Sequence, residues 1–251
     1  TPFFRAWELA GTYPEILQDE VVGESATTLF ADANAMLDQI IAEKWLTPKG
    51  VVGLWPCARD GDDVTIHLAE EEQNITLSFL RQQIRKSRDR SNMCLADFID
   101  PDGDWIGGFA VGIHGIDPHI ARFRAGHDDY NDILLKALAD RFAEAFAERL
   151  HSHVRTTLWG YAPGEQLTNE ALIKEQYRGI RPAPGYPACP DHSLKPILFD
   201  LLNATANTGI TLTESYAMLP TAAVSGFYFG HQQAEYFGVA RIGRDQLEDY
   251  A

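Results

Sequence analysis

The chain has 251 residues, 45% of them hydrophobic, and a formal net charge of −15. This composition is typical of a globular protein that buries a sizeable core without disulfides. The acidic balance argues against a nucleic-acid partner, because negative charge repels the phosphate backbone.

The cysteines and the hydrophobicity profile narrow the class further. Cys57, Cys94 and Cys189 occur without a CxxC spacing, which favours a reducing compartment over a disulfide framework or a structural zinc site. No apolar run approaches the about 18 residues of a membrane-spanning helix, and TPFFRAWELAG lacks the features of a signal peptide. We therefore expect a cytoplasmic protein with no membrane partner. Both ends look cut, so a piece of a longer chain is expected.

The first half of the chain predicts one helix and three strands. Apolar residues at helical spacing predict a helix over residues 24–44. Residues 51–57 and 63–68 predict two strands of a hairpin around the turn ARDGDD. A third strand is expected over residues 104–113, where GGFAVG indicates packed strand glycines better than a phosphate-binding loop.

The second half predicts three helices before its character changes. The strongest covers residues 130–155 and follows HDD, which offers helix caps. Shorter helices are expected over residues 168–178, ended by Gly179, and over residues 193–206.

The last third predicts short antiparallel strands. SYAML, VSGFYFG and EYFGVARI are aromatic and β-branched runs between turn residues, and RDQLEDYA begins a final helix. Strands do not alternate regularly with helices, which favours an α+β fold in one domain over a doubly wound sheet.

The segment RPAPGYPACPDH, residues 181–192, is unusually stiff. Its four prolines fix φ and restrict the residues before them, so the segment is neither a helix nor an inner strand. Its ordering entropy is largely removed in advance, which suits a loop that presents groups to a ligand. A rigid connector between helices is the alternative, with Cys189 as an inert packed thiol.

Two charged segments offer further candidates. Asp140, Glu144 and Glu148 share one helix face at i, i+4 and i+8, as a solvated row or as a carboxylate face for amines, hydroxyls or a cation. LRQQIRKSRDR, residues 80–90, is either a solvated basic face or a docking site for an acidic protein. The histidines and aspartates of HDD and CPDH lack metal-ligand spacing, so we interpret both clusters as caps.

Several motifs together resemble the activation domain of cobalamin-dependent methionine synthase. They are RPAPGYPACPDH, LTESYAM, VSGFYF, RDQLEDYA, CLADFI, HDDYN, KALADRFAEAFAE and WGYAP, in the same order over essentially the whole chain. The resemblance implies a single C-shaped α+β domain over residues 1–251, with a twisted antiparallel sheet flanked by helices.

The resemblance also implies a function. The domain would bind S-adenosylmethionine and act as a methyltransferase module, supporting reductive methylation of cob(II)alamin to methylcobalamin. The electron would come from flavodoxin or a similar flavoprotein. The cobalamin would be carried by another module, of the same or another chain, and zinc would belong only to modules absent here.

Ligand contacts follow from the resemblance position by position. Arg181 would hold the methionyl carboxylate, Tyr186 would face the sulfonium, and Asp140 would meet the cobalamin module. The expected cofactor-binding residues are Arg181, Ala183, Gly185, Tyr186, Tyr236, Phe237, Glu144 and Asp140. No catalytic or metal-ligating residue is expected.

The chain departs from the family pattern in places. A ligand-binding aspartate lies upstream of TPFF in the family, Leu219 stands where tryptophan is common, and Thr221 and Ala222 replace glycine and alanine. Two alternatives stay open: a stand-alone activation protein for a separate corrinoid methyltransferase, and a non-catalytic S-adenosylmethionine sensor. An unrelated metal hydrolase is disfavoured by the absent ligand spacing.

Overall fold

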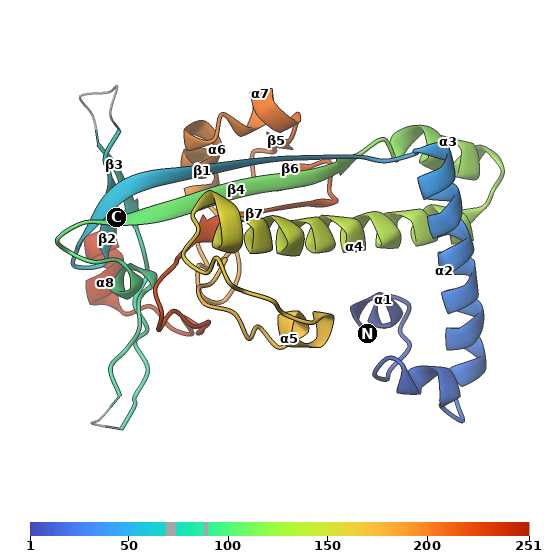
Figure 1. Ribbon diagram of the computed structural model, residues 1–251, viewed down its shortest axis with the longest axis horizontal. Helices are drawn as coiled ribbons and strands as arrows, with labels where there is room; N and C mark the ends of the chain where they lie inside the picture. Colours follow the sequence, from blue (N-terminus) through green and yellow to red (C-terminus); the bar gives the residue numbers. More distant parts are fainter. Residues whose placement is uncertain (69–73, 88–89, 251) are drawn as a thin grey trace. The chain divides into compact units, whose positions relative to one another are not determined.

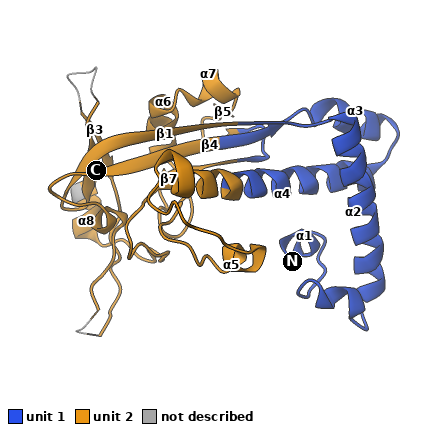
Figure 2. Ribbon diagram, viewed as in Figure 1, with its two compact units in different colours: residues 1–49, 111–147, 219–223 blue, residues 50–110, 148–218, 224–251 orange. Residues whose placement is uncertain are grey.

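The computed structural model describes residues 1–68, 74–87 and 90–250. The chain divides into two compact units, residues 1–49, 111–147 and 219–223, and residues 50–110, 148–218 and 224–251 (Figures 1 and 2). The single domain expected over residues 1–251 stays a prediction. Among the described helices, none combines the length and the apolar character needed to cross a membrane.

The first unit is mainly helical. Its helices are α1 (Pro2–Arg5), α2 (Gly23–Glu43), α3 (Asp117–Ala125) and most of α4 (Asp129–His153), with a 3-10 turn at Glu15–Gln18. The helix expected over residues 24–44 is confirmed as α2, which ends where Lys44 turns left-handed at φ 54°. Asp128 caps α4 by accepting a hydrogen bond from the backbone N of Asn131 at 3.1 Å, as the HDD motif predicts.

Aromatic side chains form much of the core of the first unit. The ring of Phe4 stacks on that of Phe30, with centroids 6.4 Å apart. Trp45 stacks on His119 at 4.0 Å, and the guanidinium of Arg122 lies 4.9 Å from the Trp45 ring centroid. Such contacts join the end of α2 to α3, a helix that the sequence did not predict.

The second unit contains most of an antiparallel sheet. The strands are β1 (Thr47–Asp60), β2 (Asp63–Ile66), β3 (Ile75–Ser78), β4 (Asp104–His114) and β7 (Ala223–Tyr228), in the order β3-β2-β1-β4-β7. Cys57 lies opposite Ile66 in the β1–β2 pair, and Val64 lies opposite Leu77 in the β2–β3 pair. The hairpin, the strand over residues 104–113 and the α+β class are thereby confirmed.

The glycines of β4 allow close packing on both faces. A Cβ on Gly108 would lie 2.5 Å from Leu198 of α6 (Leu194–Leu201), and one on Gly107 would lie 3.0 Å from Tyr228. The packed-strand interpretation of GGFAVG is therefore confirmed, and α6 lies directly on the sheet.

The expected helix over residues 168–178 is shorter in the structure. α5 (Asn169–Ile173) begins at Thr168, whose hydroxyl accepts a hydrogen bond from the backbone N of Ala171 at 3.2 Å. It ends before Glu175, which is left-handed at φ 52°, so Gly179 does not terminate it. Instead, Gly179 permits a close approach to β7, because a Cβ there would lie 2.6 Å from the carbonyl oxygen of Phe229.

The expected helix over residues 193–206 is divided. α6 and α7 (Ala204–Thr208) are separated where Asn203 turns left-handed at φ 43°, and Gly209 ends α7 at φ 77°. Downstream, the structure has β5 (Thr211–Leu212), β6 (Met218–Leu219) and α8 (Arg244–Tyr250).

The strand expected over EYFGVARI is wrong. Residues 235–242 form no strand, because their backbone groups bond elsewhere. The backbone N of Val239 donates to the carbonyl of Pro187 at 2.8 Å, and the carbonyl of Gly238 accepts from the Gln82 amide at 2.8 Å. The segment therefore lies along the proline-rich loop instead of extending the sheet.

Candidate functional site

The proline-rich loop begins as an added strand beside β7. Ile180 and Phe229 exchange two backbone hydrogen bonds of 3.0 Å, and the backbone N of Phe227 donates to the Pro182 carbonyl at 2.9 Å. Gly226 makes room for this approach, because a Cβ there would lie 2.7 Å from that carbonyl oxygen. Backbone hydrogen bonds thus fix the start of the loop to the sheet.

The tip of the loop is closed by short backbone hydrogen bonds. Gly185 N donates to Cys189 O at 2.7 Å, Cys189 N to Tyr186 O at 2.9 Å, and Tyr186 N to Ala183 O at 3.1 Å. Gly185 has φ +98°, and a Cβ there would lie 2.1 Å from the ring of His192. The turn holds Tyr186 with its side chain 62% exposed, so its ring can contact a ligand.

The far end of the loop confirms one of two minor predictions. Cys189 is buried, and burial raises its pKa to about 12, so it is a packed thiol and not a nucleophile. Asp191 accepts hydrogen bonds from the backbone N of Ser193 at 2.8 Å and from the Tyr250 hydroxyl at 2.6 Å. Its carboxylate therefore holds the turn that precedes α6, whereas α6 itself has Ser193 at its N-cap and no side-chain cap, unlike the cap expected from CPDH.

Arg181 is held by side chains from three segments of the second unit. Its Nη2 lies 2.8 Å from Oε2 of Glu148, and its Nη1 donates to Tyr177 Oη at 2.7 Å. The same Nη1 lies 3.2 Å from Nδ1 of His151. The backbone N of Arg181 donates to Tyr236 Oη at 3.0 Å. Both the guanidinium and the backbone of Arg181 are thus fixed.

The guanidinium of Arg181 keeps donors for a further partner. A guanidinium has five N–H groups, and within the described part of the chain three of those of Arg181 have partners. The N–H of Nε and one on Nη2 remain, and 17% of the side chain is exposed. Two such donors match the two oxygens of a carboxylate.

A second arginine, Arg155, lies near the carboxylate of Glu148. Arg155 is fully buried, and its Nε and Nη2 bond to the carboxylate of Glu165 at 2.7–3.0 Å. Its Nη1 lies 4.0 Å from Oε1 of Glu148, and its guanidinium lies 4.0 Å from the Tyr177 ring centroid. Glu148 therefore lies between two cations, and two carboxylates offset two guanidiniums in this cluster.

His151 and Tyr236, which both contact Arg181, are held in their neutral forms. Burial, with Arg155 and Arg181 nearby, holds the pKa of His151 well below its usual range. Burial likewise raises the pKa of Tyr236. At neutral pH the positive charge of this cluster therefore belongs to the two arginines.

The structure brings together part of the predicted set. Arg181 and Tyr236 are in direct contact, and Ala183, Gly185 and Tyr186 lie on the same loop. Phe237 is half-buried and packs on Phe98, with ring centroids 6.3 Å apart.

The remaining predicted contacts lie on α4. Asp140 and Glu144 are exposed and belong to the first unit, so their contact with a ligand stays a prediction. Glu148, the third member of the acid row, is the ion-pair partner of Arg181. The solvated-row interpretation therefore fails for Glu148.

No role was predicted from the sequence for Tyr177 or Arg155. A signal existed for the latter, because Glu148, His151 and Arg155 follow at i, i+3 and i+7 and so share one helical face. Tyr177 had no comparable signal, since it lies outside regular structure just before Gly179.

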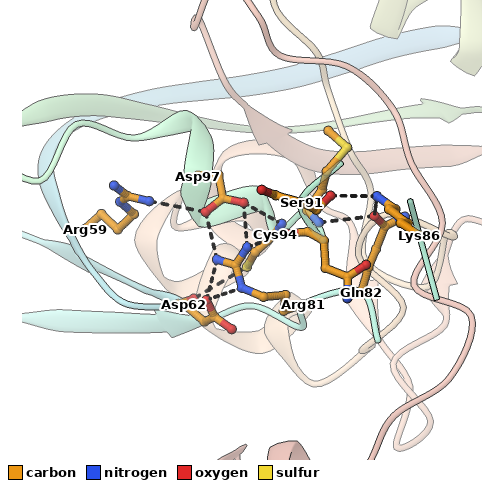
Figure 3. A network of polar contacts seen from close by, with 10 residues as sticks. Arg59, Asp62, Arg81, Gln82, Lys86, Ser91, Cys94 and Asp97 are labelled. Carbon is orange, nitrogen blue, oxygen red and sulfur yellow. Dashed lines mark hydrogen bonds and ion pairs between the residues drawn. The ribbon is translucent and has the colours of Figure 1, made fainter. Parts of the chain in front are cut away.

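The basic segment is less free than its composition suggests (Figure 3). Arg81 forms ion pairs with Asp97 at 2.7 Å and Asp62 at 2.6 Å. Lys86 donates to Gln82 Oε1 at 2.5 Å and to the Ser91 carbonyl at 2.9 Å. Both cations therefore stabilise the unit itself.

Two other cations of this segment face solvent. Arg85 and Arg90 are exposed and line a groove of about 890 Å³ together with Lys86 and Glu235. Arg88 lies outside the described residues. The docking interpretation of the basic segment therefore depends on Arg85 and Arg90.

Comparison with known proteins gives two matches. A family model described as vitamin B12-dependent methionine synthase, activation domain, matches residues 1–251. A crystal structure of a MetH reactivation domain bound to AdoHcy is similar to this chain, with 55% sequence identity and a TM-score of 0.94. The alignment covers 100% of this chain and 79% of that chain.

Proposed function

The chain belongs to the family of vitamin B12-dependent methionine synthase activation domains, and from this premise we propose that it binds S-adenosylmethionine for the reductive methylation of cobalamin. The similar reactivation domain was solved with AdoHcy, which is what S-adenosylmethionine becomes after it loses its methyl group. In this role the chain is a methyltransferase module that acts on a cobalamin carried by another module.

The observation that carries the proposal is that the guanidinium of Arg181 is anchored and still has two hydrogen-bond donors without a partner among the described residues. Its side chain is 17% exposed, three of its donors are anchored within the described residues, and two remain. A methionyl carboxylate would accept those two hydrogen bonds as a bidentate, charge-assisted pair. Because Glu148, Tyr177 and His151 already hold the guanidinium, little side-chain entropy would be lost on binding.

Other residues suit the rest of the ligand. Tyr186 presents an exposed ring from a rigid turn, which can face the sulfonium cation. Tyr236 and Phe237 come from the segment that lies along the loop, and the Ala183–Gly185 backbone would contact the ligand. For Glu144 and Asp140, the proposal rests on the family pattern, in which one carboxylate holds the ligand and the other meets the cobalamin module.

The task of this chain would be positioning. When bound, S-adenosylmethionine supplies an activated methyl group, so the protein needs no acid–base residue for the transfer. The loop and Arg181 would fix the methionyl end and thereby set the direction of the methyl group. Because the side chain of Arg181 is only 17% exposed, water would screen the carboxylate contact less than at an open surface.

An acidic flavoprotein such as flavodoxin is the electron donor that we propose. The exposed cations Arg85 and Arg90 line a groove on an otherwise acidic protein, and complementary charge would steer the donor there. We also place the domain in the cytoplasm, which suits its three free, buried cysteines.

The test is calorimetric titration of the chain with S-adenosylmethionine. We expect saturable binding by the wild type and a loss of at least about tenfold in affinity for Arg181→Ala, because a charged hydrogen-bonding partner is removed. Arg5→Ala, an exposed arginine of α1, is the control and should bind like the wild type. Equal binding by wild type and Arg181→Ala would remove Arg181 as the carboxylate anchor. Absence of wild-type binding would remove the proposed ligand site.

A further inference from the structure

The ring of His151 is a fully buried titratable group beside Arg181. It is 0% exposed at the end of α4 and is stacked on Tyr228, with centroids 4.9 Å apart and planes 15° apart. Tyr177 meets it edge-on at 5.1 Å. The proposed function uses none of its chemistry, yet its Nδ1 lies 3.2 Å from Nη1 of Arg181.

The partner of Nδ1 determines which ring nitrogen carries the proton. A guanidinium can only donate hydrogen bonds, so Nδ1 must be the unprotonated acceptor. The proton of the neutral ring then lies on Nε2, which faces Tyr161 Oη at 3.5 Å. Tyr161 in turn donates to the carbonyl of Arg178 at 3.3 Å. A continuous chain of donors and acceptors therefore runs from Arg181 to the backbone.

A charged imidazolium does not fit this position. Protonated Nδ1 would direct an N–H at a guanidinium, and both groups would then be cations and donors. The charged and titratable groups that face the ring are Arg155, Arg181, Tyr161, Tyr177 and Tyr228. The carboxylates of Glu148 and Glu165 are paired with the two arginines. The two carboxylates already offset the two guanidiniums, so a third positive charge would lack a counter-ion.

We propose that His151 is a positioning residue for Arg181, and that it acts as a neutral, Nε2-protonated hydrogen-bond acceptor. Its Nδ1 occupies one donor of Nη1 and so directs the remaining donors of the guanidinium toward the ligand carboxylate. The benefit for ligand affinity rests on the proposed function, whereas the tautomer and the restraint on Arg181 do not.

The first test needs no ligand. Nitrogen-15 NMR distinguishes an acceptor nitrogen from a proton-bearing one, and we expect His151 Nδ1 to be the acceptor from about pH 7.5 down to pH 6. Arg181→Ala should shift the Nδ1 signal. We expect sharp guanidinium signals of Arg181 in the wild type and broader ones in His151→Leu. A protonated Nδ1, or Arg181 signals indifferent to His151→Leu, would overturn the proposal.

The second test compares two variants for S-adenosylmethionine affinity. His151→Asn keeps an acceptor near the Nδ1 position, whereas His151→Leu keeps volume without an acceptor. We expect affinity to fall at least about tenfold for His151→Leu and to stay within about threefold of wild type for His151→Asn. Equal affinity for Leu and wild type would overturn the positioning role. If the wild type itself fails to bind, the proposed function fails, and the NMR result still decides the tautomer and the restraint.

Discussion

Arg81 and Asp97 form a two-pronged ion pair, with Nη1–Oδ2 and Nη2–Oδ1 distances of 2.7 Å each. The same carboxylate accepts from the backbone N of Cys94 at 2.9 Å and from Arg59 Nη1 at 3.2 Å (Figure 3). One side chain thus ties the turn Leu95–Phe98 to β1 and to the basic segment. The basic segment, residues 80–90, is therefore not an entirely free surface, because Arg81 forms ion pairs within the protein.

Removing the charge of Asp97 should therefore destabilise the fold. For Asp97→Asn we expect the free energy of unfolding to fall by about 1–3 kcal/mol, because charge-assisted hydrogen bonds to Arg81 are lost. Urea denaturation followed by circular dichroism measures this. Asp102→Asn, an exposed residue of a turn, is the matched control and should change stability by less than about 0.5 kcal/mol. Equal urea midpoints for Asp97→Asn and Asp102→Asn would contradict a stabilising role of the Asp97 ion pairs.

Breaking the Arg155–Glu165 pair should cost more. Arg155 is 0% exposed and Glu165 is 10% exposed at the side chain. Glu165→Gln leaves a buried guanidinium without its counter-ion, so we expect a loss of about 3–5 kcal/mol in unfolding free energy. Glu170→Gln disrupts an exposed i, i+4 pair with Lys174 and should cost about 0.5 kcal/mol at most. A small loss for Glu165→Gln would mean that the buried pair contributes little.

Stability should depend on pH through His151. Its pKa in the folded state is lowered, so the unfolded state binds more protons than the folded state below the usual histidine pKa of 6.5. Stability from this group is therefore complete above pH 6.5 and falls as the pH drops below it, by at most about 1.4 kcal/mol per pH unit. Denaturation of wild type and His151→Asn between pH 7.5 and pH 5 should show a shallower slope for the variant. Parallel slopes would place the proton uptake elsewhere.

The loop tip should require glycine at position 185. Gly185→Ala places a Cβ against the His192 ring at a positive φ, so we expect a loss of about 1–3 kcal/mol in local or global stability. Binding of S-adenosylmethionine should weaken as well, because Tyr186 is displaced. Gly164→Ala is the control, since no atom lies within 4 Å of a Cβ there. If Gly185→Ala binds and unfolds like Gly164→Ala, the tip does not depend on this conformation.

The rate of reactivation by the electron donor should depend on the exposed cations Arg85 and Arg90 of the basic segment. For Arg85→Glu combined with Arg90→Glu, we expect reactivation of the complete enzyme by flavodoxin to slow about tenfold or more at low salt. The salt dependence of the rate should also become smaller, because fewer opposite charges attract the donor. Arg5→Glu makes a charge change elsewhere and should have little effect. If each substituted arginine lowered the reactivation rate by the same factor, including Arg5, the effect would reflect net charge alone. That result would argue against docking at this groove.

Local patterns predicted the long elements well. α2, α4 and the β1–β2 hairpin each rest on a sustained period or a turn signal, which neighbours in sequence suffice to define. β3 has only four residues and α3 only nine, so neither carries enough repeats to stand out. EYFGVARI has the composition of a strand, but its backbone donors and acceptors found partners in a loop and in Gln82.

The candidate site divides in the same way. The stiffness of the loop and the presence of Arg181 and Tyr186 on it were visible in one segment of sequence. The anchors of Arg181 come from positions 148, 151 and 177, and their meeting depends on tertiary packing that no local pattern encodes. Likewise, no residue near Arg81 in the sequence indicates that Arg81 forms ion pairs with Asp62 and Asp97.

The proline-rich loop also has a consequence for solubility. β7 is the last strand in the order of its sheet. Pro182 of the loop bonds to Phe227 of β7, and Ile180, just before the loop, bonds to Phe229, just after β7. Without these bonds, the edge of β7 would expose unpaired backbone donors and acceptors, with which a strand of another protein chain could pair. Prolines farther along the loop cannot themselves extend the ladder, so the pairing stops after one added segment. We therefore expect the loop that we propose for ligand binding also to limit pairing of this sheet edge with other chains.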